Sequence, residues 1–335
     1  MIEIFFGLAI YVCFGLICFQ GGEISNCIYN REDVLQRLNN LRGVMAIEIV
    51  IGHIVKNNNL ILYPFNKFMI IAVAFFFFVS AFGMTVSYEK EKQYLRKFHL
   101  KILYFLSLIF IFFIYNMLVG SLVPRTLEDF PLMGPFGRNI FGYTNWYMWE
   151  LLIFYILFWI IYAIKAEYAD AIIAVITILG AMIVFKIGSY ECWYASAFAF
   201  PFGLIFGKRY NKLIHFLNSM LGRVATVVLV TLGLCSLLLP GNSLIGMVYL
   251  RNVIGIAVII LLIYMCGHFR LGNNISRKLG KYSTEIYLSQ FIYLTMAEMY
   301  QWDYKVQLIF MLVMVLLTSW ILHPLIGRIR NLIKG

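Results

Sequence analysis

Arg42 and His53 are the residues of this sequence whose types and spacing most directly suggest chemistry. They stand eleven residues apart in a mostly apolar stretch, so in a helix their side chains would lie within about 20° of each other around the axis and roughly 16 Å apart along it. Ionisable side chains inside a membrane are costly and rare, so a pair on one helical face marks a candidate functional site. The structural alternatives are an arginine that anchors a helix end and a histidine that joins two helices by a hydrogen bond.

The elements that position these residues are membrane helices, as the composition indicates. The 335 residues are 62% hydrophobic and 13% charged, and the mean hydropathy is +0.84. Soluble globular domains are nearer half apolar. The sequence therefore predicts an all-α, polytopic transmembrane helix bundle.

Apolar runs of about 17 to 25 residues predict about eleven transmembrane helices. They cover residues 2–19, 42–61, 68–87, 101–120, 145–164, 170–186, 192–207, 224–240, 244–266, 283–301 and 305–326. The first helix has no basic flank and no small-residue cleavage site, so we expect it to be retained rather than removed as a signal peptide.

Basic residues indicate how the bundle is oriented. Lysine and arginine gather at residues 90–101, 208–223, 268–281 and 328–334. Because basic loops stay in the cytoplasm, these clusters predict an N-terminus outside and a C-terminus inside. The same rule accounts for the net charge of +11, so a nucleic-acid partner is not expected. This topology puts Arg42 at the inner surface and His53 in the outer half of the bilayer.

Metal and disulfide chemistry are not indicated. The six cysteines show neither the paired spacing of a zinc site nor a disulfide framework. No glycine-rich phosphate loop and no internal repeat is present.

Four motifs carry a resemblance to a known family. Arg42-Gly43 and His53 are followed by the run Phe75-Phe76-Phe77-Phe78-Val79-Ser80-Ala81-Phe82, then by Trp146-Tyr147-Met148 at a helix start, and later by Gly280-Lys281-Tyr282-Ser283-Thr284-Glu285-Ile286-Tyr287-Leu288-Ser289-Gln290. In this order they resemble acyltransferase family three, bacterial integral-membrane enzymes that acylate surface glycans. The resemblance covers residues 38–326. It leaves residues 1–37 as an additional N-terminal helix with a cytoplasmic loop, and 327–335 as a basic cytoplasmic tail.

The sequence departs from the family pattern at three places. Ala81 stands where the family has glycine, and Gln290 stands where histidine is frequent. The family's two arginines followed by a proline are replaced by a basic stretch that contains Arg96, Lys97 and Lys101.

The resemblance implies transfer of an acyl group, with acetyl-CoA the expected donor, from the cytoplasm to a hydroxyl of an extracytoplasmic or lipid-linked glycan at the bacterial plasma membrane. For the donor phosphates we expect a cationic grip formed by Arg42, Arg96, Lys97 and Lys101. For the acceptor hydroxyl we expect His53 as the general base, since its unperturbed pKa lies near working pH. No metal is required.

Further outer-half residues are candidates for support of the acceptor side. Glu150 is expected to orient the His53 ring, or alternatively to pair with Arg251. Arg251 is expected to pair with Glu150 or Glu298, or to stabilise an oxyanion. Three aromatic residues near the outer mouth are expected to contact the glycan: Trp146, Tyr147 and Trp149. Glu48 lies about 120° from the Arg42 face and receives no role.

Two other classes of membrane protein would also bury charged residues. A transporter or flippase for a lipid-linked saccharide is one, although paired, broken helices in corresponding halves are missing from the pattern. A glycan polymerase is the other, although the connection at residues 121–145 is modest and contains only Arg125 and Arg138.

Overall fold

The computed structural model describes residues 2–19, 30–55, 61–91, 93–121, 146–189, 191–236, 245–269 and 271–334. Within these ranges the chain is helical and forms no β-strand, which confirms the predicted helical bundle. Most of the predicted outer connection at 121–145 lies outside the described residues.

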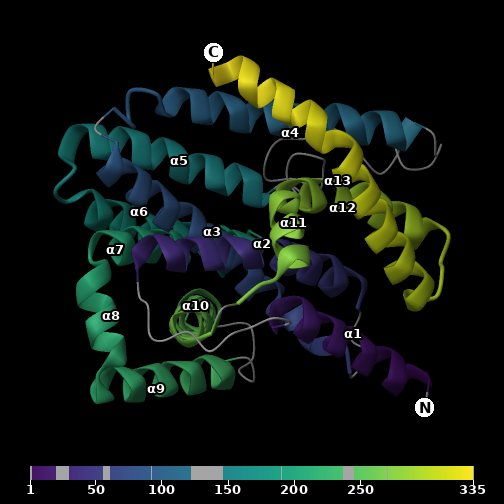
Figure 1. Ribbon diagram of the computed structural model, residues 1–335, viewed down its shortest axis with the longest axis horizontal. Helices are drawn as coiled ribbons and strands as arrows, with labels where there is room; N and C mark the ends of the chain where they lie inside the picture. The colour runs from purple at the N-terminus through teal and green to yellow at the C-terminus, as the bar shows by residue number, and fades with distance from the viewer. Residues whose placement is uncertain are drawn as a thin grey trace.

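Figure 1 shows the arrangement of the helices, which are numbered in chain order. Their bounds are α1 Ile2–Phe19, α2 Arg31–Ile54, α3 Tyr63–Lys90, α4 Phe98–Ser121, α5 Trp146–Lys165, α6 Ala169–Lys186, the 3₁₀ turn η1 Glu191–Trp193, α7 Ala199–Lys208, α8 Tyr210–Asn218, α9 Met220–Ser236, the π-helical turn η2 Ile245–Leu250, α10 Arg251–His268, α11 Asn274–Lys281, α12 Ser283–Met299 and α13 Tyr304–Lys334.

Six of the described helices are long and apolar enough to cross a membrane, or seven if the bent pair α8–α9 forms one span. The prediction of about eleven spans is therefore higher than the number that length and composition support among the described residues. The difference has physical reasons: α7 has only 10 residues, and α2 and α12 carry charged residues inside the bundle. Apolar side chains cover the outer faces of the long helices, as the exposed Leu118, Ile183, Val227 and Trp320 illustrate.

Helix α2 begins eleven residues earlier than predicted. The Asn30 side chain accepts a hydrogen bond from the Glu32 backbone N–H at 3.2 Å, and Glu32 and Asp33 occupy the first turn, where carboxylates favour the helix start. Because this segment is charged, a hydropathy scan does not detect it. Arg42 consequently lies in the middle of α2 and not at its end.

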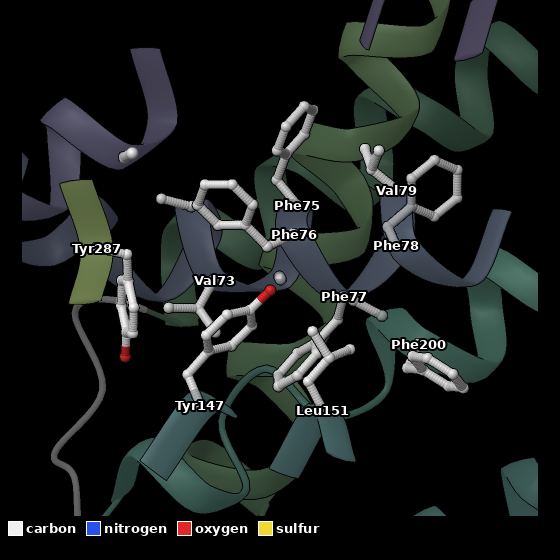
Figure 2. Packing of buried hydrophobic residues seen from close by; sticks show 14 of the residues in the cluster. Val73, Phe75, Phe76, Phe77, Phe78, Val79, Tyr147, Leu151, Phe200 and Tyr287 are labelled. Atoms are coloured by element: carbon white, nitrogen blue, oxygen red, sulfur yellow. The ribbon is translucent and has the colours of Figure 1, made fainter. Parts of the chain in front are cut away.

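Helix α3 forms the centre of the bundle and packs between α2 and α7. Its phenylalanine run is buried, and Figure 2 shows these rings between side chains of α5, α7 and α12. Phe154 of α5 and Phe200 of α7 stack with ring centroids 4.4 Å apart. In Figure 1, α10 is seen almost end-on between α9 and α3, in agreement with its contacts to α9, α3 and α2.

The short helix α7 follows a stretch of irregular backbone that α10 holds in place. Asn252 accepts a hydrogen bond from the Phe198 N–H at 2.8 Å and donates to the carbonyls of Tyr194 and Val248 at 2.6 Å. Non-helical backbone at membrane depth requires such partners because no water is available there. The predicted helix 192–207 is therefore a 3₁₀ turn, an irregular segment and a helix that begins at Ala199.

Helix α13 continues to Lys334 with Pro324 inside it. The residues predicted as a basic tail, 327–335, are thus helical up to 334. This extension brings Arg330 two turns beyond His323 on the same face, since seven residues correspond to about two turns.

Helix α2 is fixed to α11 by direct backbone contact beside Arg42. A Cβ added at Gly43 would lie 2.2 Å from the carbonyl carbon of Leu279 and 2.5 Å from the amide nitrogen of Gly280. Only glycine allows this approach, which explains the glycine that follows Arg42.

Gly43→Ala should lower the melting temperature, because overpacking of this kind costs about 1–3 kcal/mol. Gly180→Ala in α6 is the control, since nothing lies within 4 Å of the added Cβ. Thermal unfolding of the two detergent-solubilised variants provides the comparison. Equal melting temperatures would contradict the proposed close contact.

Candidate active site

Two cavities open between the helices that carry the predicted site residues. The larger, of about 600 Å³, lies between α2, α3, α4, α5, α12 and α13 and is lined by Arg42 and Lys101. We call it the basic cavity. The smaller, of about 290 Å³, is lined by His53 and Arg251. We call it the histidine cavity. Helix α2 contributes to both, with Arg42 in the basic cavity and His53 in the histidine cavity.

Arg42 has no charged partner among the described residues. Its Nε is buried and has no hydrogen-bond acceptor, and its Cζ lies 5.8 Å from the centre of the Phe76 ring. A guanidinium without a counter-charge inside an apolar bundle is costly unless a ligand supplies the negative charge.

Lys101 of α4 adds a second cation to the basic cavity. Its Nζ lies 4.6 Å from the ring centre of Tyr155 and 5.4 Å from that of Phe98, and it donates to the Tyr94 hydroxyl at 3.4 Å. No described carboxylate pairs with it, and Arg42 acts on it as a like charge. Two neighbouring cations held by aromatic faces and one hydroxyl form a site suited to an anion.

The basic cavity also contains residues that were not predicted as site residues. Lys281 and Arg330 line it, and the His323 Nδ1 lies 2.7 Å from Glu285 Oε1. The seven-residue spacing of His323 and Arg330 would have indicated a shared face had the last predicted helix been extended past 326. Glu285 also lines the basic cavity, where it pairs with His323 and forms no described ion pair with Arg42 or Lys101.

The ring of His53 is held in one orientation. Its Nδ1 lies 2.9 Å from the carbonyl oxygen of Ile49. Since a carbonyl only accepts, Nδ1 carries a proton, and in neutral imidazole the lone pair is then on Nε2. The residue is exposed although it belongs to the bundle interior, because it faces the histidine cavity. This is the arrangement required of a proton acceptor.

The groups around His53 differ from the predicted ones. Gln290 and Glu298 of α12 interact with its ring. Glu298 is thus the carboxylate that interacts electrostatically with His53. Glu150 is buried, and its Oε2 has no hydrogen-bond partner. Its carboxyl group lies within electrostatic range of Tyr147, Tyr287 and Cys192. No contact between the described Glu150 and His53 side chains supports the prediction that Glu150 orients His53.

Arg251 forms an ion pair with Glu191 of η1, so the predicted pairing with Glu150 or Glu298 is wrong. The partner could not be inferred because the segment that carries Glu191 was predicted to lie next to a regular helix. Arg251 and Glu191 both line the histidine cavity, together with Trp146, Lys67 and Ser196.

The remaining predicted residues lie elsewhere. Tyr147 lines the basic cavity and not the histidine cavity, and Trp149 lines neither. Arg96 and Lys97 are exposed outside the basic cavity, and Lys97 lies 4.0 Å from Glu91. The reason is local: the segment before α4 consists of turns at the protein surface. Glu48 is buried, with neither carboxylate oxygen hydrogen-bonded.

Among the described residues, no three histidine, cysteine, aspartate or glutamate side chains converge.

The comparison with protein families agrees with the motifs. A family model described as an acyltransferase domain matches residues 35–323. The chain belongs to acyltransferase family three. Members of this family are acyltransferases, and the apolar helices make this one a multi-pass membrane protein. No curated protein and no solved structure matches the chain.

Replacing Arg42 by an apolar residue should stabilise the ligand-free protein. Arg42→Met removes an unpaired cation and should raise the free energy of unfolding by about 1 kcal/mol. Arg37→Met in the same helix should lower it by a similar amount, because Arg37 donates to the carbonyls of Cys266 and Phe269. Chemical unfolding in detergent measures both. A loss of stability in Arg42→Met equal to that in Arg37→Met would show that Arg42 is a structural anchor.

Proposed function

We propose that this protein is a membrane O-acyltransferase that takes an acyl group from an acyl-CoA in the basic cavity and transfers it to a hydroxyl of a glycan or lipid-linked saccharide in the histidine cavity. The observation that carries the proposal is that Arg42 and Lys101 line one cavity of about 600 Å³ and that no carboxylate among the described residues forms an ion pair with either of them. Acetyl-CoA is the expected donor.

The donor side follows from charge. The phosphates of coenzyme A are polyanionic, and a guanidinium binds phosphate through two parallel hydrogen bonds. Arg42 and Lys101 lie inside the cavity, while Lys281 and Arg330 are exposed residues on its lining. The exposed cations would attract the phosphates of the donor, and the inner cations would bind them. The thioester end of the donor would then enter the protein first.

The acceptor side follows from the orientation of His53. Its Nε2 takes the proton from the acceptor hydroxyl as the oxygen attacks the thioester carbonyl carbon. The carbon–oxygen bond forms, the carbon–sulfur bond breaks, and the departing thiolate receives the proton. Trp146 offers an aromatic face for a sugar ring, and Arg251 with Glu191 offers polar groups for its hydroxyls.

The orientation of the bundle follows from the positive-inside rule. The basic cavity would face the cytoplasm, where acyl-CoA is made, and the histidine cavity would face the outside of a bacterial plasma membrane. The N-terminus would then lie outside and the C-terminus in the cytoplasm. Because Arg42 and His53 are separated by roughly 16 Å along α2, the acyl group would cross much of the apolar layer within the protein.

A transporter or flippase for lipid-linked saccharides is the second candidate, and a polymerase of such saccharides the third. Either would leave the thioester intact. The family membership favours the acyltransferase.

His53→Ala should abolish acyl transfer, with a loss of at least about 100-fold in turnover, because general-base catalysis contributes typically 10²–10⁴-fold. His268→Ala is a matched control, since His268 makes the same bond from Nδ1 to the carbonyl four residues earlier, at 3.0 Å, but lines neither cavity. The release of free coenzyme A from labelled acetyl-CoA by purified protein reports turnover. Full activity of a well-folded His53→Ala variant would contradict the assignment, and an intact thioester with the wild type would contradict the proposed function.

A further inference from the structure

Residues that line the two cavities lie next to each other on α3 and α5. On α3, Val73 lines the histidine cavity and Phe76 the basic cavity, although only about 4.5 Å of helix rise separates them. On α5, the adjacent residues Trp146 and Tyr147 line the histidine and basic cavities respectively. On both helices, residues that line the histidine cavity are therefore followed by residues that line the basic cavity, and this occurs at the same level of the bundle.

Tyr287 of α12 stands at this boundary because it lines both cavities. Its ring packs edge-on against Tyr147, with centroids 5.1 Å apart. Tyr147 in turn lies against Phe76 and Phe77 at 6.0 and 5.1 Å. Figure 2 shows Tyr287 and Tyr147 projecting from different helices beside the phenylalanine run of α3. The result is an aromatic wall with Tyr287 as the member that both cavities share.

We propose that the Tyr287 ring is the partition between the two cavities and that the acyl group passes beside it to reach the acceptor. The size of the ring then sets the length of acyl chain that this enzyme transfers. The inference rests on the proposed function, because it takes the donor to occupy the basic cavity and the acceptor the histidine cavity. A short acyl group passes beside the ring. A longer chain requires the ring to move into Tyr147, which the packing of Tyr147 against α3 opposes.

Chain-length selectivity is the first test. Tyr287→Leu removes the ring, so the ratio of octanoyl-CoA to acetyl-CoA turnover should rise at least tenfold, since pockets of fixed size discriminate single methylene groups by about 10–200-fold. Tyr287→Phe keeps the ring and should keep the wild-type ratio. Tyr293→Leu is the matched control on α12: Tyr293 is buried, its hydroxyl lies 2.6 Å from that of Thr318, and it lines neither cavity.

The outcomes separate the two proposals. Wild-type protein that transfers no acyl group would overturn the proposed function and the partition with it. Wild-type protein that transfers acetyl while Tyr287→Leu keeps the wild-type ratio would overturn the partition alone. The same rise in Tyr293→Leu as in Tyr287→Leu would also overturn it, because general loosening of α12 would then explain the effect.

A labelling experiment tests the shared position without activity. In a variant in which the six native cysteines are replaced, a cysteine at 287 should react with a membrane-impermeant thiol reagent added to either side of sealed vesicles. Cysteines at Ser80, which lines only the basic cavity, and at Ser196, which lines only the histidine cavity, should each react from one side, and from opposite sides. Reaction of the cysteine at 287 from only one side would overturn the proposal.

Discussion

Arg42 and Lys101 place two basic side chains inside an apolar bundle with no ion-pair partner among the described residues, and the rest of the structure depends on how this is achieved. Arg42 and Lys101 are surrounded by aromatic rings, whose negative faces attract cations but compensate a charge only in part. Such a pair persists because the helices that carry it are fixed by close packing. Gly43, directly after Arg42, meets the backbone of α11, and the buried phenylalanines of α3 hold the neighbouring helix in place. The cations are thereby available to an anionic ligand before it binds, which lowers the cost of ordering the site.

The second constraint is that two chemical environments share one helix. Helix α2 presents Arg42 to the basic cavity and His53 to the histidine cavity. The histidine cavity further depends on irregular backbone after α6, which Asn252 ties to α10 by three hydrogen bonds. Non-helical backbone within a membrane protein occurs where it is buried in protein or lines a cavity. Here it brings Glu191, Cys192 and Ser196 to the cavity wall.

Part of this arrangement was predictable from the sequence. Helical periodicity placed Arg42 and His53 on one face, and composition placed them in a bundle of membrane helices. Periodicity within one helix does not show which residues of other helices lie beside it. Glu150 was therefore assigned to His53, whereas Gln290 and Glu298 are the groups that act on that ring. Hydropathy also missed charged helical turns, which concealed the start of α2 at Arg31 and the extension of α13 that brings Arg330 to the basic cavity.

In the proposed reaction, the acyl group crosses between two separate cavities of one protein. Sealed vesicles that contain the purified protein, with a saccharide extract of the source cells trapped inside and labelled acetyl-CoA added outside, test it most directly. The account predicts that the label appears on the enclosed saccharide while acetyl-CoA remains outside, and that His53→Ala abolishes this labelling. Labelling that occurs only when the saccharide and acetyl-CoA are on the same side of the membrane would contradict the account.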